Sequence, residues 1–132
     1  MGKERILVVD DNPTNSKLAR IVLEMADFVV SDVADGEAAL LEVDAFGPDL
    51  ILMDIQLPGM DGLEVTRRIK DRPEHSNIVI VALTAYAMKE DSERVAAAGC
   101  DGYISKPIDT RALPEQVREY LKNRSAAGSS SV

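Results

Sequence analysis

The sequence has one cysteine, no tryptophan and no long apolar run, and each scarcity narrows the choice of protein class. Cys100 alone cannot form an internal disulfide, so a reducing cytoplasm is the expected compartment and a small packed side chain is its expected role. No stretch reaches the roughly 18 consecutive apolar residues of a membrane span. The first strand-like run begins at Arg5, which leaves no room for a signal peptide. We therefore expect a cytoplasmic protein that does not enter membranes.

Positive charge is also scarce. The chain has 15 Lys and Arg against 23 Asp and Glu, which gives a net charge of -8 at pH 7. Such a chain is not expected to bind nucleic acid or anionic lipid unaided, and basic surfaces are favoured as partners. With 132 residues, 45% of them hydrophobic, the chain is long enough for one domain with its own core.

Apolar runs rich in Val, Ile and Leu alternate with segments whose apolar residues recur at helical spacing. This alternation is typical of βα units around a parallel sheet, and five rounds of it fit the chain. The expected strands are residues 5–9, 28–33, 48–54, 78–83 and 103–105. The expected helices are residues 13–26, 36–46, 61–71, 88–98 and 109–122. The sequence therefore predicts an α/β fold with one parallel sheet.

Caps and spacing predict details of the helices. Asn12 is the expected N-cap of the first helix, whose apolar residues share one face that should pack on the core. These residues are Leu18, Ile21, Val22 and Met25. Gly99 offers the left-handed conformation that ends the fourth helix, and Pro114 is tolerated in the first turn of the fifth. Residues 1–123 should form the folded domain, and residues 124–132 have the composition of a flexible tail or linker.

Charged and hydroxyl side chains follow four of the expected strands where each one ends. They are Asp10 and Asp11 after the first, Asp54 at the end of the third, Thr84 after the fourth and Lys106 after the fifth. Because ligands bind at the carboxyl ends of the strands in open α/β sheets, these groups should converge on one site. Three clustered carboxylates repel one another unless a proton or a cation lies among them. Their hard oxygen atoms suit Mg²⁺, or Mn²⁺ in its place.

Such a site is suited to phosphoryl transfer. One of the carboxylates could attack a phosphoryl group and form an aspartyl-phosphate, while a metal ion and an ammonium group stabilise charge on the transferring oxygens. Lys106 is the candidate ammonium group. Thr84 could donate its hydroxyl to a phosphoryl oxygen, which would make it a switch residue.

Each of these residues also has a purely structural interpretation. Asp10 and Asp11 could cap the helix that follows them. Thr84 could be an ordinary β-branched strand residue, and Lys106 could be a surface lysine. The coincidence of three acids at strand ends favours the site. The only histidine, His75, lies in a turn remote from these strand ends and is expected to be exposed, so it is a poor candidate for phosphorylation.

Several spaced motifs together resemble one known family. They are Asp10-Asp11, Asp54 with Pro58-Gly59 and Gly62 behind it, Thr84-Ala85, and Lys106-Pro107. In this order and at these strand ends, they make residues 4–123 resemble the CheY-like receiver domain of a two-component response regulator. The sequences around these motifs are similar both to DivK-like single-domain receivers and to the receivers of hybrid sensor kinases. The residues do not distinguish between these two subfamilies. The resemblance implies a flavodoxin-like (βα)5 doubly wound fold, with a five-stranded parallel sheet of order 2-1-3-4-5.

The resemblance also implies a phosphorylated residue and a metal site. Asp54 would be the phosphoacceptor. Asp11 would bind the Mg²⁺ directly and Asp10 through water, while Asp54 and the backbone carbonyl of Gln56 would complete the protein ligands.

The remaining implied roles concern switching. Lys106 would pair with the phosphoryl oxygens, and its peptide bond to Pro107 is expected to be cis. Thr84 would turn toward the phosphoryl group, and Tyr103 would swing inward to fill the vacated space. The output surface would be formed by the fourth helix, the fifth strand and the fifth helix.

Together these features predict a switch in a phosphorelay. A histidine kinase or a histidine phosphotransfer protein would supply the phosphoryl group, and phosphorylation would change the affinity for a downstream protein target. The only reactions catalysed would be the chain's own phosphorylation and dephosphorylation. Direct binding to nucleic acid or to a membrane is not expected.

Three other functions compete with this one. A receiver-like interaction module that works without phosphorylation would usually have lost an acid or the lysine, and none is lost here. A flavin-binding protein of similar fold would need a phosphate-binding loop rich in glycine and hydroxyl groups, together with aromatic side chains against the ring. A metal-dependent phosphatase would need a second acid two residues after Asp54, where Gln56 stands.

Overall fold

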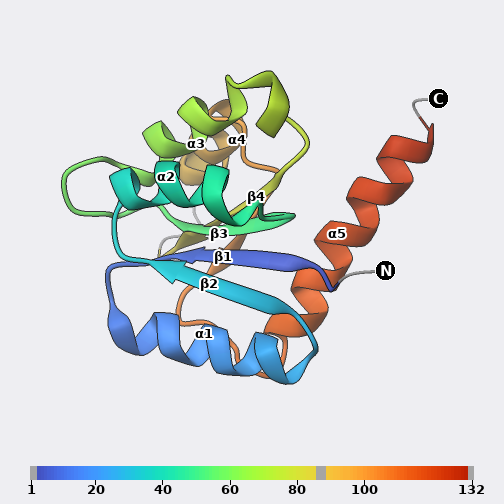
Figure 1. The fold of residues 1–132 in the computed structure, drawn as a ribbon. Coiled ribbons are helices and arrows are strands. Elements are labelled where there is room, and N and C mark those ends of the chain that lie inside the picture. The colour runs from blue at the N-terminus through green and yellow to red at the C-terminus, as the bar shows by residue number, and fades with distance from the viewer. Residues whose placement is uncertain (1–2, 86–88, 131–132) are drawn as a thin grey trace.

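Five parallel strands form a single sheet in the computed structural model, which describes residues 3–85 and 89–130 (Figure 1). The strands are β1 (Arg5–Val9), β2 (Val29–Val33), β3 (Leu50–Asp54), β4 (Val79–Thr84) and β5 (Gly102–Ser105). Their order across the sheet is β2-β1-β3-β4-β5, and every neighbouring pair is parallel. The predicted α/β fold and its strand order are therefore confirmed.

Helices cover both faces of the sheet (Figure 1). They are α1 (Pro13–Met25), α2 (Gly36–Phe46), α3 (Gly62–Lys70), α4 (Lys89–Ala97) and α5 (Leu113–Ser130), with a short 3-10 helix, η1, at Pro73–His75. The layer of α1 and α5 packs on one face, and the layer of α2, α3 and α4 packs on the other. The predicted start of the fourth helix at Met88 lies outside the described residues, and Gly99 after this helix has the expected left-handed φ of 100°. None of the described helices combines the length and the apolar character needed to cross a membrane.

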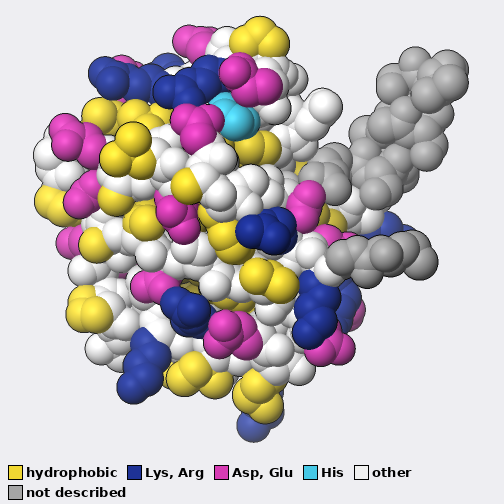
Figure 2. Space-filling view, viewed as in Figure 1, with side chains coloured by type: hydrophobic (Ala, Val, Ile, Leu, Met, Phe, Trp, Pro, Cys, Tyr) yellow, Lys and Arg dark blue, Asp and Glu magenta, His cyan; other side chains and the backbone are white. Residues whose placement is uncertain are grey.

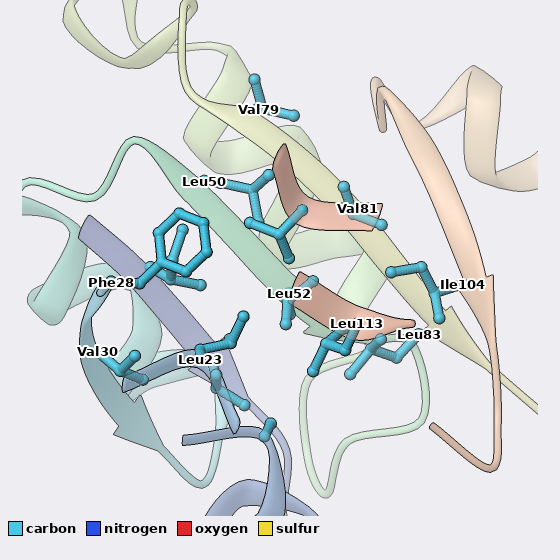
Figure 3. Close-up of a cluster of buried hydrophobic side chains, with 14 of the residues drawn as sticks. Leu23, Phe28, Val30, Leu50, Leu52, Val79, Val81, Leu83, Ile104 and Leu113 are labelled. Carbon is cyan, nitrogen blue, oxygen red and sulfur yellow. The ribbon is translucent and has the colours of Figure 1, made fainter. Parts of the chain in front are cut away.

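Alternate residues of the central strands supply two hydrophobic cores. In β3, Leu50 and Leu52 pack with α1 and α5, as Figure 3 shows, whereas Ile51 and Met53 pack with α2 and α3. All residues of β3 and β4 are buried, as expected for parallel strands covered by helices on both faces. Because a slip of one residue would exchange the two cores, the pairing register is fixed. This register places the carboxyl ends of β1 and β3 side by side.

The prediction for the buried face of α1 is wrong. Ser16, Ala19 and Leu23 face the sheet, whereas the side chains expected in the core lie at the surface. Leu18 and Ile21 are each 46% exposed, Met25 is 82% exposed and Val22 is half-buried. Both sets of residues have helical spacing. The set that packs against the sheet includes the small residues Ser16 and Ala19, which allow the helix to approach the sheet closely. The four displaced residues form an exposed apolar surface, called here the α1 strip.

Helix α5 begins later and ends later than predicted. Its backbone starts at Leu113 because Pro114, which has no N–H to donate, is then the second helical residue. Asp109 instead organises the preceding turn, in which its carboxylate accepts from the backbone N–H of Arg111 at 3.0 Å. The helix continues to Ser130, beyond the predicted end near Lys122 and beyond its last buried residue, Leu121.

The expectation that His75 is simply exposed is also wrong. Its side chain is 13% exposed, and its Nε2 lies 2.8 Å from Oδ1 of Asp44. Hydrogen bonds from His75 and from Arg72 lower the pKa of the Asp44 carboxyl group. His75 lies in the turn before β4, at the edge of the sheet opposite to the predicted site. Cys100 behaves as predicted, because burial raises the pKa of its thiol to about 11 and keeps it protonated.

Candidate functional site

Three carboxylates meet at the carboxyl edge of the sheet. Asp10 follows β1, Asp11 begins the loop into α1, and Asp54 ends β3, which is the neighbour of β1. One oxygen from each side chain lies within 4.8 Å of the other two. Asp10 is 2% exposed and Asp54 is 3% exposed, whereas Asp11 is exposed to solvent. The structure thus brings together the three acids that the sequence placed at strand ends.

Lys106 reaches this cluster from the end of β5. Its Nζ donates to Oδ2 of Asp54 at 2.8 Å and lies 3.4 Å from Oδ2 of Asp10. Its backbone N–H donates to the carbonyl of Thr84 at 2.7 Å, which joins the ends of β4 and β5. The peptide bond between Lys106 and Pro107 is cis. Lys106 is therefore an ammonium group held directly beside a buried carboxylate.

Backbone N–H groups hold one oxygen of each buried carboxylate. Asn12 donates to Oδ1 of Asp10, and Gln56 donates to Oδ1 of Asp54, each at 2.9 Å. The other oxygen of Asp10, Oδ2, is buried and has no hydrogen-bond partner, although the ammonium of Lys106 lies within ion-pair distance. A buried carboxylate oxygen that lacks a donor and lies beside two further carboxylates fits a hard divalent cation.

The pKa values of Asp54 and of Lys106 are both raised, for different reasons. Burial raises the pKa of Asp54, and this effect together with the charge of Asp10 outweighs the opposing hydrogen bonds from Lys106 and Gln56. Burial alone would lower the pKa of Lys106, but the hydrogen bond and the charges of the two acids raise it. The two directions look inconsistent for an ion pair, since pairing should lower the carboxyl pKa. Both directions hold because burial dominates at Asp54, whereas the ammonium of Lys106 faces two carboxylates.

Two further residues named in the sequence lie at this edge of the sheet or near it. Thr84 ends β4, is 2% exposed and pairs in register with Ser105 of β5. Tyr103 lies on β5 with 40% of its surface exposed, and its carbonyl accepts from the hydroxyl of Tyr120 on α5 at 3.3 Å. In this structure Tyr103 is therefore a surface residue, not a buried one.

The backbone donors of Asn12 and Gln56 were missed by the sequence analysis. Both follow an aspartate by two residues, which is the spacing of an Asx-turn, so a signal was present. A third contact, from the hydroxyl of Ser16 to the carbonyl of Asp10 at 3.2 Å, was missed as well. The sequence carried no signal for this contact, because the expected core face of the helix was the other one.

Comparisons with known proteins identify close relatives. The family model of the response regulator receiver domain matches residues 6–118. The polar-differentiation response regulator DivK of Brucella anthropi is 44% identical over 116 residues, which are 88% of this chain and 94% of that protein. The matched residues include every strand end that carries the site.

Solved structures give the same result for the fold. A CheY-like response regulator receiver domain protein from Methanospirillum hungatei has a TM-score of 0.87 and 29% identity, covering 96% of this chain and 99% of that one. The receiver domain of a signal transduction histidine kinase from Syntrophus aciditrophicus has a TM-score of 0.82 and 30% identity, covering 91% of each chain.

Proposed function

Because this chain belongs to the response regulator receiver family and acts in phosphorelay signalling, we propose that its Asp54 carboxylate accepts the phosphoryl group. The observation that carries this proposal is the 2.8 Å contact between Asp54 and Lys106, beside two further acids, at the end of a buried strand. Asp10 also lies near Lys106, but its contact is longer, at 3.4 Å, and only Asp54 of these two acids accepts a hydrogen bond from the ammonium group. The receiver unit would comprise residues 1–123 and act in the cytoplasm, with residues 124–132 as a tail or linker.

The phosphoryl donor would be a phosphohistidine on a histidine kinase or a histidine phosphotransfer protein. A carboxylate oxygen of Asp54 attacks the phosphorus, so that a P–O bond forms while the P–N bond to the donor breaks and its electron pair returns to the imidazole. The ammonium of Lys106, already beside Asp54, then lies against the developing negative charge on the phosphoryl oxygens.

The acids Asp10, Asp11 and Asp54, with the backbone carbonyl of Gln56, would hold Mg²⁺, or Mn²⁺ in its place. When bound, the cation neutralises charge on the phosphoryl oxygens and on the acids that surround them. The buried Oδ2 of Asp10 supports this choice of ligand, because it accepts no hydrogen bond and lies beside two further carboxylates.

Thr84 and Tyr103 would transmit the effect of phosphorylation from the site to the protein surface. Thr84 would donate its hydroxyl to a phosphoryl oxygen, and Tyr103 would move from the surface into the space that Thr84 leaves. The changed surface would comprise α4, β5 and α5, and a downstream protein target would bind there.

The α1 strip suggests where the phosphoryl donor docks. It consists of apolar side chains, and Figure 2 shows hydrophobic groups exposed among charged ones over α1. Helix α1 starts two residues after Asp11, so the strip and the acidic site lie on the same helix and the loop before it. A groove of about 550 Å³ on the β2 side of α1 is lined by Asp10, Asp11 and residues of α1 outside the strip. We propose that an amphipathic helix of the donor protein packs on this strip and so brings its phosphohistidine to Asp54.

This docking predicts a selective defect. The variant Ile21→Asp should accept the phosphoryl group from a phosphorylated histidine phosphotransfer protein about tenfold more slowly, since a charge would replace a central apolar contact. Its phosphorylation by acetyl phosphate should be unchanged. The matched control is Leu41→Asp on α2, where Leu41 is 74% exposed on the other layer and both rates should stay normal. Equal transfer rates for Ile21→Asp and Leu41→Asp would refute the docking site.

The proposed chemistry is tested by intact-mass spectrometry of the wild-type chain after incubation with acetyl phosphate. With Mg²⁺ present, a gain of about 80 Da is expected from one phosphoryl group on a carboxylate. With EDTA in place of Mg²⁺, no gain is expected, because the carboxylates would then repel the anionic donor. If the protein binds Mg²⁺ but gains no mass, it is an interaction module that works without phosphorylation.

A further inference from the structure

Ser16 is a buried hydroxyl residue at the end of the first turn of α1, and the proposed chemistry does not use it. It is 4% exposed and lies on the face that α1 turns toward the sheet, in line with Ala19 and Leu23. Its Oγ donates to the backbone carbonyl of Asp10 at 3.2 Å. A serine inside a helix ordinarily donates to the carbonyl three or four residues before it, within the same helix. Ser16 instead bonds six residues back, outside the helix and in the acidic site.

The contrast with Thr66 shows that this contact is not needed for the helix. Thr66 is also fully buried, on α3, and its Oγ1 donates to the carbonyl of Gly62 at 2.9 Å. That is the ordinary contact four residues back. Ser16 already has its helical bond, since its backbone N–H donates to the carbonyl of Asn12 at 3.1 Å. The hydroxyl of Ser16 therefore serves the loop that carries the acids.

The bond from Ser16 acts on Asp11 through the shared peptide plane. The carbonyl of Asp10 and the N–H of Asp11 belong to one planar peptide unit. A hydrogen bond that holds this carbonyl therefore also fixes the direction in which the side chain of Asp11 leaves the backbone. The preceding peptide unit is held by the N–H of Asp10, which donates to the carbonyl of Val33 at 3.2 Å. Within the described residues, the side chain of Asp11 makes no hydrogen bond or ion pair of its own. Its orientation depends on its backbone.

We propose that Ser16 is a positioning residue that orients Asp11, through the Asp10–Asp11 peptide, for binding of the divalent cation. This inference rests on the proposed metal site. Without the hydroxyl, the buried carbonyl of Asp10 loses its donor, and the peptide plane is free to rotate toward another partner. The carboxylates of Asp10 and Asp11 would then no longer be held at the spacing that suits one ion. Groups that orient metal ligands in this way change metal affinity by tenfold or more when they are removed.

The test is the Mg²⁺ affinity of the unphosphorylated protein, measured by isothermal titration calorimetry. Ser16→Ala is expected to bind Mg²⁺ about tenfold more weakly than the wild type. Ser16→Cys keeps the shape of the side chain but replaces the hydroxyl with a larger and weaker donor, so its Mg²⁺ affinity should fall in the same direction. This second variant decides the question if Ser16→Ala does not fold. The matched control is Thr66→Val, which also loses a buried hydroxyl from a helix and should keep the wild-type affinity.

The outcomes separate this inference from the function on which it rests. If the wild type binds Mg²⁺ and folded Ser16→Ala or Ser16→Cys binds it equally well, Ser16 has only a structural role and the inference is overturned. An equal loss of affinity in Thr66→Val would overturn it too, because general loosening of the fold would then be the cause. Absence of Mg²⁺ binding in the wild type would instead refute the proposed metal site.

Discussion

Asp54→Asn is expected to abolish phosphorylation by acetyl phosphate, with a loss of at least about 10³-fold in rate, because an amide lacks the nucleophilic carboxylate oxygen. Asparagine has nearly the same size, and its single side-chain oxygen can still accept from one of the two donors that contact Asp54, which are Lys106 and the N–H of Gln56. The rate is measured from the mass gain over time. Asp44→Asn is the control, since Asp44 lies at the opposite edge of the sheet and should not affect the rate.

The same variant should not fail by unfolding. A carboxyl group whose folded pKa is raised stabilises the fold below its unfolded pKa, and this contribution is lost as the pH rises through the folded pKa. Because burial raises the pKa of Asp54, its ionised form costs stability at pH 7 without metal. Asp54→Asn removes that charge, so its melting temperature in EDTA should equal or exceed that of the wild type. Phosphorylation of a folded Asp54→Asn at the wild-type rate would show that another residue is the acceptor.

Gly62→Ala is expected to destabilise the fold by about 3 kcal/mol, because its new methyl group would overlap backbone that cannot move aside. Gly62 begins α3 where this helix meets the end of β3, and its N–H donates to the carbonyl of Ile55 at 3.3 Å. A Cβ at this position would overlap the carbonyl oxygen of Asp54 and lie 2.8 Å from Cα of Ile55. Thermal unfolding followed by circular dichroism should show a melting temperature lowered by roughly 10 °C.

Gly47→Ala is the matched control for this effect. Gly47 has a φ of 64°, but a Cβ there would meet no atom within 4 Å. The substitution should therefore cost only the strain of a left-handed alanine, about 1 kcal/mol. If Gly62→Ala lowered the melting temperature no more than Gly47→Ala does, the close packing of α3 on β3 would not matter at this position.

The fold and the clustering of the site residues could be predicted because both depend on local features of the sequence. Each strand of a covered parallel sheet is a short apolar run, so its end is visible where the first polar residue appears. Asp10, Asp54 and Lys106 follow such runs, and a parallel sheet with βα connections brings their ends to one edge. The strands were therefore located to within about two residues, and the acids were placed together.

The face of α1 could not be predicted because two sets of residues share helical spacing. Leu18, Ile21 and Met25 are more apolar than Ser16 and Ala19, so the spacing rule alone puts them inside. The structure buries the smaller residues and leaves the larger ones at the surface. The choice depends on how closely the helix must approach the sheet, which is a property of the packed layers. Hydrogen bonds such as that from Ser16 to Asp10 are hidden from the sequence for the same reason.

The residue that carries the phosphoryl group can be identified chemically. The protein is phosphorylated with acetyl phosphate and Mg²⁺ and reduced with borohydride, which converts an aspartyl-phosphate to homoserine, and the modified residue is then located by tandem mass spectrometry. We expect homoserine at position 54 alone, and none when EDTA replaces Mg²⁺. Homoserine at position 10 or 11, or a phosphoryl group on His75, would contradict this expectation.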